Sequence, residues 1–134
     1  MPLLTLTTWP ALTDAGERLA VARELTDHTA RLLGKQLPLT AVAVLAPPLG
    51  WSLGGEPLLP QAPPPAPART FALEIRITAG TNTAAQKAAW IAAAWDTLRR
   101  AVPGALAEAS YVSIVEIAAT DWGYGGRTQA SRRT

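Results

Sequence analysis

The chain contains no cysteine among its 134 residues, and that absence excludes several classes of function. Disulfides, thiolate metal sites and cysteine nucleophiles all need the missing side chain. His28 is the single histidine, so neither of the two residue types that dominate metal sites is present as a cluster. We therefore expect no metal centre, and the lack of cysteine suits a cytoplasmic protein.

Strong net charge and long apolar runs are also missing. The net charge is +2, and the basic excess collects near the C-terminus at Arg127, Arg132 and Arg133. No Lys/Arg face with interleaved aromatics accompanies these arginines, which argues against nucleic-acid binding. The longest apolar stretches fall short of the roughly 18 residues that a membrane span needs, and no basic segment opens a secretory signal. We expect a soluble, cytoplasmic protein without nucleic-acid or membrane partners.

The first half of the chain has the pattern of a strand, a helix and a second strand. A β-prone run covers residues 3–8, and a proline that cannot donate to a β-ladder interrupts it. A helix is predicted over 14–34, where it ends at a glycine suited to a C-cap. A second strand is expected over 40–46, followed by the sequence Trp-Ser-Leu-Gly-Gly at 51–55.

The second half repeats this order. A strand is predicted over 71–78, a helix begins at a capping box, and a strand follows over 111–118. The sequence Trp-Gly-Tyr-Gly-Gly at 122–126 lies 71 positions after its counterpart at 51–55. The agreement of order, capping pairs and hairpins at nearly constant displacement indicates a duplication.

A proline-rich segment separates the two halves. Residues 56–69 contain six prolines, so we expect an extended polyproline-type linker without a core of its own. The organisation predicted is therefore one domain over 1–134, made of two repeats, 1–55 and 70–126, joined by the linker 56–69.

Helical spacing predicts which face of each helix is buried. On the first helix the stripe contains Val21, Leu25, His28 and Leu32. On the second helix the expected stripe contains Ile91, Trp95, Leu98 and Val102.

The predicted fold class is α+β, which in broader usage is also called α/β. Strands joined by a helical crossover pair in parallel with a right-handed connection. Two such β-α-β units predict a four-stranded mixed sheet with two helices on one face. The other face carries Thr5, Thr7, Glu74 and Arg76, and so short a chain has nothing left to cover it. We expect self-association to bury that face.

Three features together resemble the tautomerase superfamily. They are Pro2 directly after Met1, the mid-helix Leu-Thr-Asp at 25–27, and the Gly-Gly hairpins. The 122–126 sequence is similar to the aromatic-Gly-x-Gly-Gly ending of 4-oxalocrotonate tautomerase subunits, which are one unit long. Two units in one chain resemble the fused members, and related two-unit branches include cis-3-chloroacrylic acid dehalogenase, malonate semialdehyde decarboxylase and macrophage migration inhibitory factor (MIF). The resemblance implies a tautomerase/MIF-like fold, a homotrimer and catalysis without a cofactor.

Pro2 is the catalytic residue that this resemblance implies, and its chemistry can be argued separately. Removal of Met1 leaves a secondary amine at the start of a strand. An α-amine titrates nearer neutrality than lysine, and burial lowers the pKa of an amine further, toward that of a general base at pH 7. Phe71 takes the place of Pro2 in the second repeat and is internal, so each chain offers one such proline.

The substrate-binding residues are less clearly indicated. In 4-oxalocrotonate tautomerase two arginines bind the substrate carboxylates, and Leu12 and Ala43 stand at the matching positions here. Arg76 and Arg127 are the replacement candidates. Arg76 is equally explained by a structural pair with Glu74, and Arg127 by a solvated end.

Three aromatic residues are further candidates for the substrate site. Trp51 and Trp122 either wall the site or pack subunits together, and Tyr111 begins a strand from which it could reach a site mouth. His28 lies on a helix stripe, which favours a packing role over catalysis.

Asp121 is the second candidate for catalysis. It is similar to the carboxylate that precedes an aromatic-Gly pair and activates water in cis-3-chloroacrylic acid dehalogenase. That branch also carries two arginines where Thr78 and Thr81 stand here, and a turn-capping role explains Asp121 as well.

The function predicted is a cofactor-independent tautomerase that interconverts the enol and keto forms of a small 2-keto acid. Pro2 is its general base and a small molecule is its ligand. One alternative is a related hydratase, decarboxylase or dehalogenase that uses Pro2 and Asp121. The other is a non-catalytic trimeric binding protein.

Overall fold

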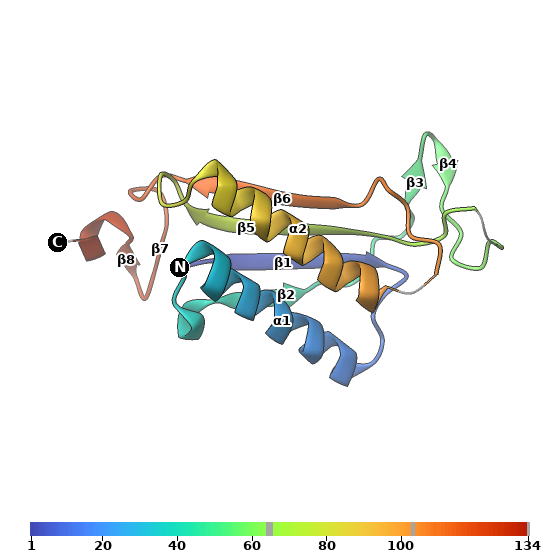
Figure 1. The fold of residues 1–134 in the computed structure, drawn as a ribbon, viewed down its shortest axis with the longest axis horizontal. Coiled ribbons are helices and arrows are strands. Elements are labelled where there is room, and N and C mark those ends of the chain that lie inside the picture. The colour runs from blue at the N-terminus through green and yellow to red at the C-terminus, as the bar shows by residue number, and fades with distance from the viewer. Residues whose placement is uncertain (64–65, 103, 134) are drawn as a thin grey trace.

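Two copies of a β-α-β unit follow one another in Figure 1, a computed structural model that describes residues 1–63, 66–102 and 104–133. The first copy contains β1 (Leu3–Trp9), α1 (Ala15–Leu33), the 3-10 turn η1 (Leu37–Leu39) and β2 (Ala41–Val44). The second contains β5 (Thr70–Thr78), α2 (Ala84–Ala101) and β6 (Tyr111–Ile117). Each copy ends in a small hairpin: β3 (Ser52–Leu53) with β4 (Glu56–Pro57), and β7 (Gly123–Tyr124) with β8 (Arg127–Thr128), after which comes the 3-10 turn η2 (Ala130–Arg133).

The sheet has the order β2-β1-β5-β6 and mixes parallel and antiparallel pairs. β1 pairs in parallel with β2, and β5 in parallel with β6, because a helix crosses over within each unit. The units meet where β1 and β5 pair antiparallel, with Leu3 opposite Arg76. This sheet and the two helices on one of its faces confirm the predicted fold class (Figure 1).

Both helices begin where the sequence places a cap. The Asp14 side chain accepts a hydrogen bond from the Glu17 N–H at 2.8 Å, and Gly34 ends α1 in the left-handed conformation with φ 66°. Thr83 and Gln86 complete a reciprocal capping box at the start of α2. Pro103, which the sequence suggested as a helix stop, lies outside the described residues.

The core lies between the helices and the sheet. Alternate residues of β1 and β5 point toward the helices and are fully buried, since successive strand residues face opposite sides of a sheet. The helices contribute complementary rows that meet these strands; the central residues are Leu4, Leu6, Val21, Leu25, Phe71, Leu73, Ile75, Ile77, Trp90, Ala94 and Leu98.

The stripe predicted on α2 is wrong at Ile91, whereas Leu98 and Val102 are buried and Trp95 packs against the core. Trp90 is fully buried, whereas Ile91 is 38% exposed. Trp90 lies 69 positions after Val21, the same displacement as the helix caps, and its indole N–H donates to the buried Thr29 hydroxyl at 3.1 Å. The indole therefore fills the space between the helices while satisfying its polar edge.

The segment between the repeats is more structured than a free polyproline linker. Glu56 and Pro57 form β4, and Leu58 is buried, with its carbonyl accepting the Trp9 indole N–H at 2.8 Å. Ala68 is also buried, beside the second unit. The central prolines, 64 and 65, lie outside the described residues.

The face of the sheet opposite the helices is open in the single chain. A shallow hollow of about 220 Å³ lies across β1, β5 and β6 on this face; its lining residues are Thr5, Thr7, Ala72, Leu73, Glu74, Tyr111 and Ser113. Tyr111 is 63% exposed on this face. Among the described residues, no helix combines the length and apolar character that crossing a bilayer requires.

Candidate active site

Pro2 lies at the start of β1 and is buried. Its carbonyl accepts a hydrogen bond from the Ala41 N–H at 3.2 Å, which ties this end of β1 to β2. The terminal amine in the structure is that of Met1, whose pKa is lowered by burial and then by the positive charge of Lys35. Removal of Met1 would transfer the terminal amine to Pro2, one residue deeper in the same surroundings.

A cavity of about 390 Å³ opens at this end of β1. Three segments that are distant in sequence form it: the N-terminus, the end of α1 with η1, and the C-terminal hairpin with η2. Figure 1 shows β7, β8 and the C-terminal end beside the N-terminus. The lining residues are Met1, Gly34, Lys35, Gln36, Leu39, Tyr124, Gln129, Arg132 and Arg133.

Lys35 enters the cavity wall because α1 ends at Gly34. The Lys35 N–H donates to the Thr29 carbonyl at 3.4 Å, and its Nζ donates to the Thr81 hydroxyl at 2.8 Å. Burial lowers the pKa of Lys35, Arg133 adds to this effect, and the carboxylate of Glu116 opposes it. The ammonium thus lies near both a carboxylate, that of Glu116, and a guanidinium, that of Arg133.

The hairpin β7–β8 forms the opposite wall. Gly125 and Gly126 make its turn with φ 61° and 77°, values that glycine adopts without strain. The Trp122 indole N–H donates to the Thr78 hydroxyl at 3.1 Å and fastens the hairpin to the end of β5. Beyond the turn, the guanidinium of Arg132 lies 3.9 Å from the centre of the Tyr124 ring.

Arg76 lies opposite Leu3, the residue after Pro2, but its side chain is on the open face. It pairs with Glu74 at 3.0 Å, and both side chains are substantially exposed. The structural pair considered for Arg76 is therefore present. It leaves part of the guanidinium free to meet another molecule on that face.

Asp121, Trp122 and Arg127 line a separate depression of about 280 Å³ at the base of the second hairpin. The Asp121 N–H donates to the Ala118 carbonyl at 2.8 Å, and its carboxylate accepts the Thr120 hydroxyl at 2.8 Å. This is the geometry of a turn residue. Arg127 donates to the Ser131 carbonyl at 3.2 Å.

Trp51 and Tyr111 lie at the end of the molecule opposite Pro2. Trp51 precedes the hairpin β3–β4, which Figure 1 shows at the end opposite the N-terminus. Tyr111 begins β6, opposite Ala72 near the start of β5. Within one chain, neither aromatic side chain contributes to the cavity beside Pro2.

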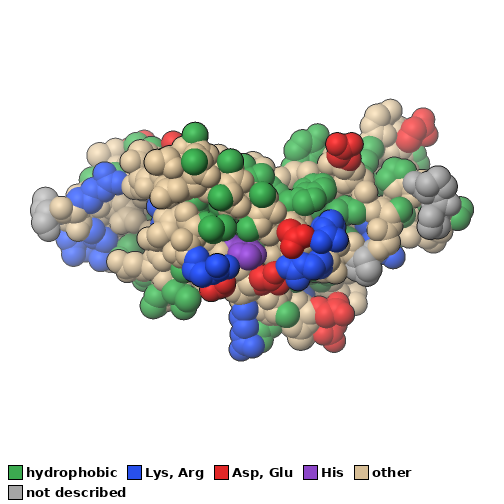
Figure 2. Space-filling view, viewed as in Figure 1, with side chains coloured by type: hydrophobic (Ala, Val, Ile, Leu, Met, Phe, Trp, Pro, Cys, Tyr) green, Lys and Arg blue, Asp and Glu red, His purple; other side chains and the backbone are tan. Residues whose placement is uncertain are grey.

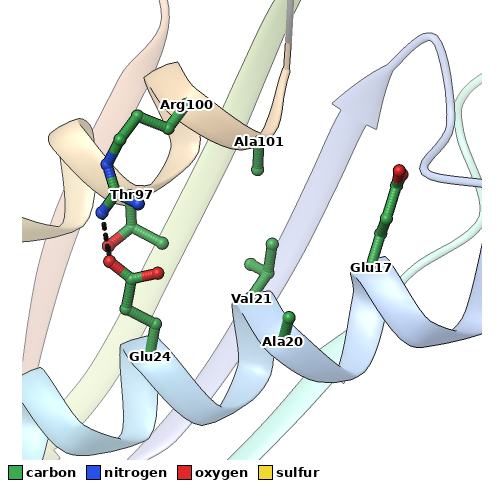
Figure 3. A pocket seen from close by; sticks show the side chains of 7 residues that line it. All are labelled: Glu17, Ala20, Val21, Glu24, Thr97, Arg100 and Ala101. Atoms are coloured by element: carbon green, nitrogen blue, oxygen red, sulfur yellow. Dashed lines mark hydrogen bonds and ion pairs between the residues drawn. The ribbon is translucent and has the colours of Figure 1, made fainter.

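The helices carry a second groove, of about 310 Å³, on the surface away from the sheet (Figure 3). Arg100 of α2 reaches across to Glu24 of α1, which also accepts the Thr97 hydroxyl at 3.0 Å. His28 bonds to Thr97 at 2.9 Å, its counterpart at a displacement of 69 residues, and so joins the two helices. Figure 2 shows this histidine among paired charges in the middle of the helical face.

Sequence reasoning assigned none of the residues that line the cavity to the site. The polar side chains that it missed are Lys35, Gln36, Tyr124, Gln129, Arg132 and Arg133. Lys35 directly follows a C-cap glycine, and Arg132 was grouped with a solvated tail. No local pattern held the signal, because the cavity forms only where the residues after the Gly-Gly turn fold back to the N-terminus. Among the described residues, no group of three or more His, Asp or Glu side chains is placed to hold a metal ion.

Solved structures share this fold over nearly the whole chain. A structure described as native fused 4-OT is 27% identical, covers 97% of this chain and 96% of its own, and superposes with a TM-score of 0.72. The F6 fused 4-OT wild-type asymmetric trimer is 21% identical, with coverage of 98% and 99% and a TM-score of 0.76. Macrophage migration inhibitory factor of Toxoplasma gondii is 17% identical, with coverage of 94% and 98% and a TM-score of 0.72.

No family model and no curated protein matches the sequence. The structural likeness to fused 4-OT and to MIF nonetheless confirms the resemblance and the tautomerase/MIF-like fold predicted from the sequence.

Proposed function

We propose that this chain, which has the fold of fused 4-OT proteins, is a cofactor-independent tautomerase with Pro2 as its general base. The observation that carries the proposal is the position of Pro2, buried at the start of β1 beside a cavity with cationic walls. Burial and Lys35 already lower the pKa of the Met1 amine, and they would act on a Pro2 amine in the same direction. A neutral amine at pH 7 can accept a proton.

The reaction proposed is the ketonisation of a small enol of a 2-keto acid. The neutral Pro2 amine takes the proton from the enol hydroxyl, and the electron pair of the O–H bond forms the carbonyl as the C=C pair moves to C3. The Pro2 ammonium then delivers a proton to C3. Protons balance over the cycle, so no cofactor is needed.

A homotrimer is the assembly that we propose. Structures described as fused 4-OT trimers cover 98% of this chain. Trimerisation would bury the open sheet face, where Arg76 and Tyr111 lie, and would bring Trp51 of one subunit toward the site of another. Arg127 and Trp122 would then remain candidates for contacts at the rim of the site.

Ketonisation of phenylenolpyruvate, followed in the ultraviolet, tests the proposal. The protein should be untagged, with removal of Met1 verified by mass spectrometry. Pro2→Ala retains a terminal amine but loses the rigid secondary amine, and we expect kcat/KM to fall at least about hundredfold, within the range typical of general acid–base catalysis. An unchanged rate would exclude Pro2 as the base, and equally slow ketonisation by wild type and variant would favour a non-catalytic binding protein.

A related hydratase is the second candidate, because Asp121, Trp122 and Arg127 share one depression. In that enzyme protonated Pro2 would act as an acid while Asp121 activates water. Asp121→Asn should then abolish hydration of 2-oxo-3-pentynoate and preserve ketonisation. Equal hydration by wild type and Asp121→Asn would exclude this candidate function.

A further inference from the structure

The cavity beside Pro2 is unusually rich in positive charge for its size. Lys35, Arg132 and Arg133 line it together with the terminal amine, and none of its described lining residues is acidic. Glu116, whose charge acts on Lys35, is paired with Lys87. A cavity with several cations and no carboxylate favours an anionic ligand.

Arg132 is held in a fixed position within this wall. Its guanidinium lies over the Tyr124 ring at 3.9 Å, and its Nη2 donates to the Tyr124 carbonyl at 2.9 Å. Stacking and a backbone hydrogen bond together reduce the freedom of a long side chain, so less entropy is lost when a ligand binds.

The Nε atom of Arg132 is a donor without an acceptor. It is buried, and no described residue accepts its hydrogen bond. Buried donors are nearly always satisfied, so an unpaired one suggests a group that the chain itself does not supply. Arg132 also lines the cavity, where a guanidinium is a strong donor to an anion such as a carboxylate.

We propose that Arg132, supported by Tyr124 and Lys35, binds the substrate carboxylate within the same chain as Pro2. This inference rests on the proposed function and names the residues that replace the arginines missing at Leu12 and Ala43. One side of the cavity then offers the base, and the other holds the acid group of the substrate. Removal of Met1, which also lines the cavity, would enlarge the space between them.

Affinity for 3-phenylpropionate, measured by calorimetry, tests the site without requiring catalysis, because this monoacid has no enol to convert. Arg132→Gln keeps a polar amide on a shorter side chain and loses the charge. We expect it to weaken binding about tenfold or more, the size of a lost charge-assisted hydrogen bond, and to raise KM for phenylenolpyruvate more than it lowers kcat. Arg132→Lys should recover part of the affinity.

Two controls isolate the effect. Arg99→Gln removes an exposed cation of α2 that pairs with Asp96, and it should leave the affinity unchanged. The uncharged 3-phenylpropionamide should bind wild type and Arg132→Gln equally. Tyr124→Leu removes the ring below Arg132 but keeps the carbonyl, so we expect a smaller loss of about two- to fivefold.

The outcomes separate the two proposals. Affinity within twofold of wild type in Arg132→Gln, or no binding by wild type, would overturn the carboxylate site even if Pro2→Ala is inactive. Full activity of Pro2→Ala would overturn the proposed function, and a tenfold loss of 3-phenylpropionate affinity in Arg132→Gln would still support the anion site. If Arg132→Gln does not fold, as judged by circular dichroism, Arg132→Lys and Tyr124→Leu decide the question by the same titration.

Discussion

The two repeats share their architecture but differ at the start of their first strands. β1 begins directly after Pro2, next to the chain terminus, whereas β5 begins at Thr70 inside the chain, with Phe71 fully buried against Trp95. Because β1 and β5 are antiparallel, these starts lie at opposite ends of the sheet. The same duplicated element therefore offers a terminal amine at one end and a packed aromatic ring at the other.

The hairpins that end the two repeats share their turn but differ in the segments that follow them. Gly54 and Gly55 have φ 59° and 81°, close to the values at Gly125 and Gly126, so both repeats make the same turn. The first hairpin continues into the connector and packs through Leu58. The second continues into η2 and places arginines beside the N-terminus. Duplication thus yields one end suited to chemistry and one end suited to joining the units.

The largest expected effect comes from blocking the terminal amine of the first repeat, so that the Pro2 nitrogen becomes an amide like that of Phe71 in the second repeat. A glycine added before Pro2 and left in place in the mature protein would make this change. We expect ketonisation to fall by about 10²–10⁴, since an amide nitrogen accepts no proton. Phenylenolpyruvate kinetics on protein of verified mass measure this.

A matched insertion tests whether the loss is local. One glycine inserted after Gln61, in the exposed part of the connector, adds the same residue near the second repeat and should leave kcat/KM unchanged. Activity of the N-terminally extended protein equal to that of the Gln61 insertion would contradict a catalytic amine.

For stability we expect the opposite: a substitution at Phe71 should cost more than one at Pro2. Phe71 is fully buried, with its ring centre 5.1 Å from that of Trp95, so Phe71→Ala should lower the free energy of unfolding by about 3–5 kcal/mol. Phe71→Leu, which retains most of the volume, should cost about 1.5 kcal/mol or less. Urea denaturation measures both, and a loss from Pro2→Ala as large as that from Phe71→Ala would remove the division between the two ends.

A smaller effect distinguishes the hairpins. A Cβ added at Gly123 would overlap the backbone carbonyl of Arg127, whereas the equivalent position of the first hairpin, Ser52, already carries an exposed side chain. Gly123→Ala should destabilise β7–β8 by about 1–3 kcal/mol and weaken 3-phenylpropionate binding. Ser52→Ala should change neither thermal unfolding nor that affinity. Similar behaviour of the two variants would show that the hairpins are interchangeable.

The smallest expected effect is a shift in pH dependence. Burial lowers the pKa of the terminal amine, and the charge of Lys35 lowers it further, so activity of a neutral base should persist toward neutral pH and fall as the pH drops through that pKa. Lys35→Gln removes a repulsive charge, which raises the amine pKa and moves the acidic limb of kcat/KM to higher pH. Lys35→Arg keeps the charge and should leave the limb in place; an unmoved limb in Lys35→Gln would contradict the coupling.

Much of the fold could be predicted from the sequence because caps and periodicity are local signals. The capping residues Asp14 and Thr83 both begin helices, and all four long strands occur where β-prone runs end in turns. In the stripe predicted on α2, Ile91 was taken as buried in place of Trp90, because the two are adjacent apolar residues. Only the interhelical contact with Thr29 decides between them.

The cavity was harder to predict because it joins distant segments. Lys35, Tyr124 and Arg132 each have an ordinary local explanation: a helix end, a hairpin residue and a basic tail. Their common position depends on how β7–β8 and η2 fold back toward β1, which no local pattern encodes. Pro2 could be predicted from the sequence because the chemistry proposed for it depends on its place in the chain, and its catalytic role stays a prediction.

The separation of Pro2 and Arg132 along the chain also orders events during synthesis. At about 5–20 residues per second, Pro2 leaves the ribosome on the order of ten seconds before Arg132 is made. Methionine aminopeptidase would therefore meet an N-terminus that the C-terminal turn cannot yet cover. The proposed removal of Met1 would then precede closure of the cavity, although in the finished fold the two ends of the chain lie together.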